Sequence, residues 1–180
     1  MHYTLCDSIL DLYQNSVEAN SKNVIMDFIQ SESSLIVNIK DDGKGMDSDT
    51  LNRVKDPFYT DGIKHKNRKV GLGIPFIIQT AEMTDGSFNL KSVAGKGTEL
   101  NIVFNLKHWD TPPMGSIVDM LISAMSMDGD FEFVFNREDR ERELEYTVSR
   151  AELIDVLGDL TRVTNMILLK EFIASQELDN

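Results

Sequence analysis

The spacing of apolar residues changes along the chain from a helical to an alternating period, and this change constrains the fold more than any other feature of the sequence. Between residues 5 and 19, apolar side chains recur every three or four positions, which predicts an amphipathic helix. At 23–30 and 35–40 they alternate with polar ones across a serine-rich break, which predicts two hairpin-connected strands. This mixture of elements places the chain in the α+β class.

Further elements are predicted up to about residue 106. Residues 50–54 are expected to form a short helix, and residues 74–82 a longer one after a polar, irregular stretch. Two more alternating runs, 87–92 and 98–106, flank a glycine-rich turn and are predicted to be strands. Helices and pairs of strands are therefore mixed throughout the first part of the chain.

The chain changes character after its first hundred residues. Pro112 and Pro113 lack backbone donors, so residues 107–115 are interpreted as a linker. The formal net charge is -12, and most of the acidic excess lies beyond this linker. We expect two units, a domain over residues 1–107 and a small acidic α+β domain over residues 114–180.

The second unit is predicted to contain a helix, a hairpin and a further helix. The first helix is expected at 117–125 and the hairpin strands at 131–135 and 144–148. Residues 149–152 have the form of a capping box ahead of a long final helix. The charges at 137–143 alternate in sign, which predicts a solvated hairpin tip.

Composition excludes several classes of function. An acidic chain lacks the basic footprint that duplex nucleic acid or an anionic membrane requires. Cys6 is the only cysteine, so no internal disulfide forms, and no cysteine and histidine cluster has zinc-ligand spacing. No apolar run approaches the roughly 18 residues that span a bilayer. We expect a soluble, cytoplasmic protein that binds neither a nucleic acid duplex nor a membrane.

The first segment that suggests chemistry lies in the opening helix. Asp11 and Asn15 are four residues apart and therefore share one helical face. An amide oxygen is a hard, neutral ligand for Mg²⁺, and a carboxylate beside it can orient or deprotonate an attacking water. The alternative is an ordinary solvated polar face, which most surface helices carry.

A second segment, residues 41–46, follows directly after a predicted strand and contains two glycines. The Asp41 carboxylate can accept a hydrogen bond from the exocyclic amine of adenine. Glycines let the backbone approach a ligand closely and adopt a positive φ. The alternative is an ordinary turn. A calcium loop is disfavoured, because Lys44 and Met46 occupy positions where further oxygen ligands belong.

Two further glycine-containing segments complete the set. Residues 64–73 place several positive side chains before Gly71 and Gly73, at the start of a predicted helix, which suits a triphosphate. The alternative is a solvated loop, because Gly-x-Gly alone is weak evidence. Residues 95–99 lie between two predicted strands and, taken alone, indicate only a hairpin turn.

In this order and spacing, the four segments resemble the Bergerat-type or GHKL superfamily of ATPases, which includes histidine kinases, DNA gyrase, Hsp90 and MutL. The resemblance covers about residues 3–106 and includes a phenylalanine-containing box at 56–60. It implies a two-layer α/β sandwich, with helices on one face of a mixed sheet. It further implies ATP and Mg²⁺ as cofactors, and a mobile lid at 55–70 that orders over ATP.

The resemblance also assigns roles to single residues. Asn15 would coordinate Mg²⁺, Asp41 would recognise adenine, and Thr98 would join that contact through water. Gly43 and Gly45 would shape the base pocket. The other positions assigned to nucleotide binding are Met46, Thr60, Lys64, Gly71, Leu72 and Gly73.

Asp11 departs from the family pattern. Hydrolysing members have glutamate at this position, and many histidine kinases have asparagine. Because aspartate is shorter than glutamate, whether this chain hydrolyses ATP stays open. One expected function is an enzyme, either an ATPase or a kinase acting in trans, with Asp11 as base. The alternative is a non-catalytic, nucleotide-responsive module that signals to a protein partner. A protein partner or a homodimer is expected, and autophosphorylation in cis is not.

Overall fold

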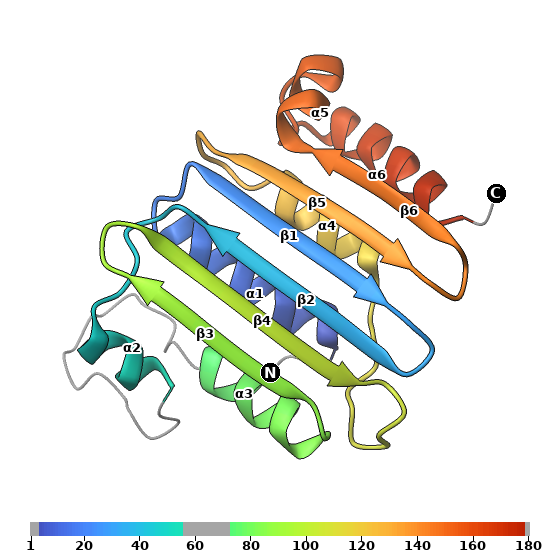
Figure 1. The fold of residues 1–180 in the computed structure, drawn as a ribbon. Coiled ribbons are helices and arrows are strands. Elements are labelled where there is room, and N and C mark those ends of the chain that lie inside the picture. Colours follow the sequence, from blue (N-terminus) through green and yellow to red (C-terminus); the bar gives the residue numbers. More distant parts are fainter. Residues whose placement is uncertain (1–3, 56–72, 179–180) are drawn as a thin grey trace.

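The computed structural model describes residues 4–55 and 73–178, and these residues form one six-stranded mixed sheet (Figure 1). The strand order is β3, β4, β2, β1, β5, β6, and every neighbouring pair is antiparallel except β1 and β5, which are parallel. The strands are β1 Asn23–Gln30, β2 Ser34–Asp41, β3 Ser87–Val93, β4 Gly97–Asn105, β5 Glu132–Asp139 and β6 Leu144–Ser149. The predicted α+β class is confirmed.

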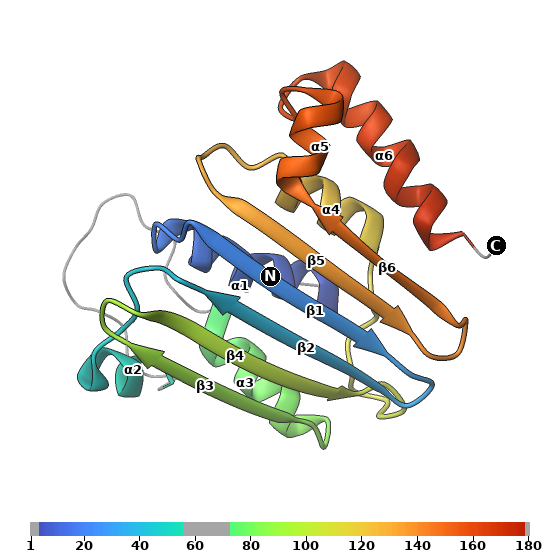
Figure 2. The same ribbon diagram turned by 45° about the horizontal axis from the view of Figure 1, so that its top comes forward.

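Helices cover one face of this sheet. The helices in the described part of the chain are α1 Leu5–Glu18, α2 Ser48–Val54, α3 Gly73–Met83, α4 Ile117–Met125, α5 Arg150–Leu157 and α6 Val163–Glu177. Of these, α2 lies beyond the β3 edge of the sheet (Figure 1). Helices α3, α1, α4 and α6 follow one another across the sheet, because α1 contacts α3 and α4, and α4 contacts α6. The turned view in Figure 2 shows the opposite face bare of these helices. The predicted two-layer sandwich is therefore confirmed, and none of the described helices is long and apolar enough to cross a membrane.

Helix α1 forms where the sequence predicts it, because both its end and its inner side are satisfied. The Thr4 hydroxyl oxygen accepts a hydrogen bond from the Asp7 amide at 3.1 Å and caps the first turn. On the inner side Tyr13 is fully buried, and its hydroxyl donates to the Ala124 carbonyl of α4 at 3.2 Å. This packing fixes the direction in which the polar face with Asp11 points.

The C-terminal segment joins the same sheet. Strand β5 pairs with β1 along its whole length, with Phe133 opposite Val24. The Phe133 ring lies 4.3 Å, centroid to centroid, from the Tyr13 ring on α1, within a single cluster of buried residues. The predicted units 1–107 and 114–180 thus share one sheet and one core, and their division into two folding domains stays a prediction.

Two helices, rather than one, follow the predicted capping box. The Ser149 hydroxyl oxygen accepts from the Glu152 amide at 3.2 Å, as the sequence predicts. Helix α5 then ends at Gly158, whose φ of 79° and ψ of -144° leave the helical region. The prediction of one long final helix was wrong, because Gly158 adopts a backbone conformation that interrupts it.

The charged run at 137–143 is not simply a solvated tip, and that prediction was wrong for two residues. Arg137 and Asp139 are each 2% exposed. The Arg137 guanidinium donates to Asp139 at 3.0 Å, to Glu177 at 3.0 Å and to Gln30 at 2.9 Å. Successive strand residues point to opposite faces, so every second residue of β5 faces the helices. This cluster attaches the last turn of α6 to the sheet.

A row of polar side chains crosses the open face and ties the two parts of the chain together. Asp27, in the middle of β1, accepts from Asn38 on β2 at 3.4 Å and from Asn136 on β5 at 2.8 Å. Thr147 on β6 donates to Asn136 at 2.9 Å. These cross-strand bonds reinforce the junction between β1 and β5 on the face opposite the helices.

Candidate functional site

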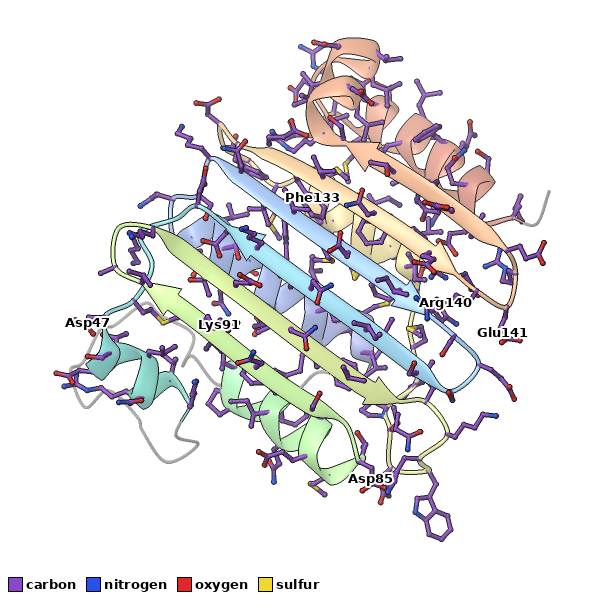
Figure 3. The ribbon with its side chains drawn as sticks, in the orientation of Figure 1. Asp47, Asp85, Lys91, Phe133, Arg140 and Glu141 are labelled. Carbon is purple, nitrogen blue, oxygen red and sulfur yellow. The ribbon has the colours of Figure 1, made fainter. Side chains whose placement is uncertain are left out.

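The predicted site residues gather at one end of the sheet. Figure 3 labels Asp47 at the start of α2, the helix that follows β2, and Arg140 and Glu141 in the β5–β6 turn at the opposite end. The C-terminal end of α1, the end of β2 and the β3–β4 turn all lie at the Asp47 end (Figure 1). Segments that are far apart in the sequence therefore meet there.

Asp41, the last residue of β2, is the buried charge at the centre of this end. It is only 6% exposed. Its Oδ2 accepts from the Ser16 hydroxyl at 2.8 Å, and its Oδ1 accepts from the Gly43 amide at 2.9 Å and lies 3.2 Å from the Ser21 hydroxyl. Burial of a carboxylate is costly unless such donors surround it, and these donors also fix its orientation.

Ser16 and Ser21 bring the first segment to this carboxylate and were not among the predicted site residues. Both are buried, and the Ser21 hydroxyl donates to the Ser16 carbonyl at 2.6 Å. Ser16 follows Asn15 within the segment 11–19, so the sequence could have indicated Ser16 as a site residue. Ser21 carries no local signal, because its role depends on the end of a strand twenty residues away at Asp41.

The glycine turn after β2 wraps closely around its neighbours. Gly45 has a φ of 60°, and a Cβ on it would stand 2.0 Å from the Val93 carbonyl oxygen, so only glycine fits. The Lys44 amide donates to the Ala19 carbonyl at 3.0 Å, and the Lys44 carbonyl accepts from the Gly95 amide at 2.7 Å. The turn thus joins the end of α1 to the β3–β4 turn and brings the first, second and fourth segments together.

Thr98 lies on the other side of Asp41, and a third serine holds it there. Thr98 on β4 pairs with Asp41 on β2, and its hydroxyl lies 3.0 Å from the Ser92 hydroxyl. The Ser92 oxygen also accepts from the Met46 amide at 2.9 Å and donates to the Gly97 carbonyl at 3.0 Å. Ser92 therefore connects Thr98 and Met46, but a serine in an alternating strand carries no signal in the sequence.

Asp11 and Asn15 lie on the polar side of α1. Asn15 is exposed and Asp11 is partly buried. A Cβ built on Gly73 would stand 2.1 Å from Asp11 Oδ2, so the carboxylate lies against the first residue of α3. The free amides of a helix N-terminus carry partial positive charge. The structure thus brings the first segment to the glycine at the end of the third.

Four predicted site residues lie outside the described residues. They are Thr60, Lys64, Gly71 and Leu72. The phenylalanine-containing box at 56–60 and the predicted lid, apart from Lys55, lie outside them as well. The roles of these residues stay predictions.

Asp42, directly after Asp41, has a different environment. Its carboxylate accepts from the Lys22 amide at 2.7 Å and from the amide and side chain of Asn23 at 2.9 Å and 2.7 Å. The side-chain bond from Asn23, followed by the backbone bond, holds the pKa of Asp42 below its ordinary value. Asp42 is exposed, and its bonds fix the start of β1 against the end of β2.

The donor set at Asp41 is compatible with an adenine amine. An ionised carboxylate offers about four acceptor positions, and the Ser16 hydroxyl and the Gly43 amide take two of them. The Ser21 hydroxyl lies beside a third but shares its one proton with the nearer Ser16 carbonyl, so at least one position is left for a further donor. Among the described residues no group of three or more His, Cys, Asp and Glu could hold a metal. Mg²⁺ is usually held by one or two protein oxygens together with substrate phosphates, and Asn15 offers such an oxygen.

Known proteins are similar to this chain in sequence over its first part. Residues 4–108 match the family described as histidine kinase-, DNA gyrase B-, and HSP90-like ATPase. Sporulation kinase C of Bacillus subtilis (strain 168) is 30% identical over 100 residues, which cover 54% of this chain and 22% of the kinase. A putative sensor protein of Shewanella frigidimarina (strain NCIMB 400) is 31% identical over 105 residues, which cover 57% of this chain and 16% of that protein. The chain therefore spans less than a quarter of the length of these relatives.

A solved structure shows the same fold over more of the chain. The crystal structure of the N-terminal domain of a DNA repair protein superposes with a TM-score of 0.56 and 11% sequence identity, covering 91% of this chain and 58% of that one. At this identity the likeness concerns the fold alone. The family match covers more than half of the chain and includes α1, β2, α3 and β4, which carry the candidate site. The chain belongs to the family of histidine kinase-, DNA gyrase B-, and HSP90-like ATPases.

Proposed function

We propose that this chain binds ATP together with Mg²⁺. The observation that carries the proposal is the buried Asp41 carboxylate, which the Ser16 hydroxyl and the Gly43 amide orient while an acceptor position is left for the exocyclic amine of adenine. Membership of the ATPase family supports the same ligand. In this proposal Gly43, Gly45 and Met46 border the base, and Thr98 joins the contact through a water.

Asn15 and Gly73 serve the phosphate end in this proposal. The Asn15 side chain, exposed on α1, supplies an oxygen to Mg²⁺. The amides at the start of α3, which begins at Gly73, suit an anion. When bound, Mg²⁺ would neutralise phosphate charge and polarise the terminal phosphoryl group.

For turnover, we assign Asp11 the role of the base that accepts a proton from the attacking group. Its carboxylate lies against Gly73, at the end of the site assigned to the phosphates, which supports this role. The acceptor is then water in an ATPase, or a protein side chain in a kinase acting in trans. The second candidate is a nucleotide-responsive module without turnover, which the short reach of aspartate at this position favours.

Calorimetric titration with ATP and Mg²⁺ tests the binding proposal. Asp41→Asn replaces one acceptor oxygen by a donor group, so we expect at least about a tenfold loss of affinity. Asp42→Asn is the matched control, because Asp42 is adjacent, exposed and bonded to Lys22 and Asn23 instead. Equal affinities of wild type and Asp41→Asn reject the adenine assignment.

Phosphate release from the same samples separates the two candidate functions. If the wild type releases phosphate and Asp11→Asn binds ATP without releasing it, Asp11 acts as the base of an ATPase. If the wild type binds ATP and neither releases phosphate nor phosphorylates a protein in a cell extract, the nucleotide-responsive module is supported instead. Asn15→Ala should weaken binding only when Mg²⁺ is present, because its assigned role is to hold that ion.

A further inference from the structure

Helix α6 has apolar side chains on both its inner and its outer side. The inner residues Leu169 and Ile173 are fully buried in the common core, and α6 packs against α4. The apolar residues on the outer side are Val163, Ile167, Leu168 and Phe172, which are 73%, 54%, 49% and 42% exposed, and Thr164 and Glu171 are exposed among them. A surface helix normally presents a polar outer side, whereas a helix that is apolar all round is normally covered all round.

This outer surface continues onto α5 and lies away from the candidate site. Val156 is 81% exposed and Ile154 is 37% exposed on α5, which packs beside α6. Figures 1 and 2 both place α5 and α6 at the β6 edge of the sheet, with α2 and β3 at the other edge. Apolar side chains gathered in this way mark an interaction surface.

The surface is carried by a firmly anchored helix. At the end of α6, Glu177 accepts from the buried Arg137 at 3.0 Å and from the Tyr146 hydroxyl at 2.6 Å. In its middle, Lys170 forms an ion pair with Asp119 of α4 at 3.3 Å. A helix that is already fixed loses little conformational freedom when a partner covers it.

The outer residues of α6 are arranged symmetrically along the helix. Ile167 and Leu168 flank the midpoint of the set, and Val163 and Phe172 lie at equal distances on either side of it. If two copies of this helix pack antiparallel about a twofold axis, Val163 of one copy faces Phe172 of the other. Ile167 then faces Leu168, so that one surface is complementary to itself.

Charge favours the antiparallel over the parallel arrangement. Arg162 directly precedes α6, and Glu171 lies in its C-terminal half. Antiparallel packing places Thr164 of one copy opposite Glu171 of the other and brings Arg162, which forms an ion pair with Asp159 of its own chain at 3.6 Å, toward the same carboxylate. Parallel packing would place the two Glu171 side chains together, and like charges at such distances are repulsive. The helix dipoles also oppose each other favourably only in the antiparallel pair.

We propose that the outer surface of α6 is the interface between two copies of this chain, packed antiparallel about a twofold axis. The helix has 15 residues. It is therefore about 22 Å long. With α5 beside it, the pair buries roughly 1,200 Å² in total, at the lower end of the range for stable interfaces. The dimer is therefore in equilibrium with the monomer, and its formation does not depend on the nucleotide site.

Sedimentation velocity of the full chain tests the interface. Over a roughly hundredfold range of protein concentration, we expect a shift from monomer to dimer. Combining Ile167→Glu with Leu168→Glu should leave only monomer, and circular dichroism should show an unchanged fold because both side chains are about half exposed. Combining Met83→Glu with Val93→Glu is the matched control, since these residues are 61% and 54% exposed elsewhere on the molecule.

Two results of this experiment would overturn the proposal. A wild type that stays monomeric at every concentration overturns the proposal and assigns the surface to a different chain. A dimer that survives the double substitution on α6 also overturns it, because the interface then lies elsewhere. Neither result bears on ATP binding, which the titration of the monomer measures separately.

Engineered cysteines test the direction of packing. Thr164→Cys mixed with Glu171→Cys should cross-link under mild oxidation, because a disulfide requires Cβ atoms about 3.5 to 4.5 Å apart. Each variant alone should stay uncrosslinked. Cross-linking of Thr164→Cys with itself, or a mixture that does not cross-link, overturns the antiparallel geometry. The natural Cys6 is buried and does not take part.

Discussion

Asp11 and Gly73 lie on different helices, yet they are so close that a Cβ on Gly73 would stand 2.1 Å from Asp11 Oδ2. Asp11 belongs to α1, and Gly73 is the first residue of α3. Negative charge is stabilised at a helix N-terminus. The two helices are therefore coupled at the end of the site where we propose that the phosphates bind.

Substitution of Gly73 tests this coupling. In the wild-type background the added methyl group of Gly73→Ala must displace the Asp11 carboxylate, so we expect a net loss of about 1 kcal/mol in unfolding free energy. In an Asp11→Ala background the clash is absent, so Gly73→Ala, at the first residue of α3, should change the unfolding free energy by less than about 0.5 kcal/mol. Denaturant titrations of the four proteins measure this cycle. Equal effects of Gly73→Ala in both backgrounds would contradict the proximity.

Ser92→Ala should loosen the site from the β3 side. The substitution removes the acceptor of the Met46 amide and the partner of the Thr98 hydroxyl. We expect a loss of about 1 kcal/mol in stability and a severalfold loss of ATP affinity. Ser87→Ala, at the exposed far end of β3, is the control and should change stability by less than about 0.5 kcal/mol. An unchanged ATP affinity in Ser92→Ala would show that the contacts of Ser92 with Met46 and Thr98 do not position the nucleotide.

Arg137→Met should be strongly destabilising. Arg137 is fully buried, and its removal takes from the buried Asp139 carboxylate its closest charged partner, leaving the Arg142 side chain at 4.0 Å. Glu177 also loses its bond to Arg137 and keeps those to Arg142 and Tyr146. Breaking a buried ion pair in this way costs about 3 to 5 kcal/mol. Arg140→Met removes an exposed arginine of the same strand turn, 57% accessible, and should cost less than about 1 kcal/mol. Thermal unfolding of both variants measures this difference in stability. Similar melting temperatures would refute the importance of the buried cluster.

The Cys6 thiol should be unreactive in the folded protein. Burial, with a smaller contribution from the charge of Asp7, raises the pKa of the Cys6 thiol from 9.0 to about 12. Because the folded pKa is the higher one, the contribution of the neutral thiol to stability is complete below pH 9 and is lost as the pH rises through 12. Labelling with a thiol reagent below pH 9 should therefore follow unfolding, whereas the exposed thiol of Ser87→Cys should react at once. Rapid labelling of Cys6 in the native wild type would contradict its burial.

Local elements were predictable from the sequence because their signals are local. The helical period over residues 5–19 corresponds to α1, and the alternation at 23–30 and 35–40 corresponds to β1 and β2 within a residue or so. The Ser149 cap was readable because its partner, Glu152, lies only three residues away. Periodicity and capping depend on neighbours in the sequence, so no knowledge of the tertiary structure was needed.

Contacts between distant segments were not predictable in the same way. The pairing of β5 with β1 joins residues more than a hundred positions apart, and it depends on the whole sheet rather than on a short pattern. The burial of Arg137 was missed for the same reason, because its partners Gln30 and Glu177 come from opposite ends of the chain. A run of alternating charges indicates solvent-exposed side chains only where no carboxylate and amide from distant parts of the chain pack against it.

The candidate site contains residues that the sequence could predict and residues that it could not. The recognised segments placed Asp41 and the glycines, whose residue types are distinctive. Ser21 and Ser92, which hold the Asp41 carboxylate and the Thr98 hydroxyl, were missed because serine is common in loops and strands. Their roles appear only when the ends of β2, β3 and α1 are brought together.

Comparison of ATP with inosine triphosphate, by calorimetric titration of the wild type in the presence of Mg²⁺, tests the central claim most directly. Inosine has a carbonyl oxygen where adenine has the exocyclic amine, and its N1 carries a hydrogen, so at the position of the amine only ATP presents a donor to Asp41. We predict that ATP binds and that inosine triphosphate binds at least about 100-fold more weakly, because a buried acceptor is then left facing another acceptor. Absence of ATP binding, or equal affinity for the two nucleotides, would contradict the account.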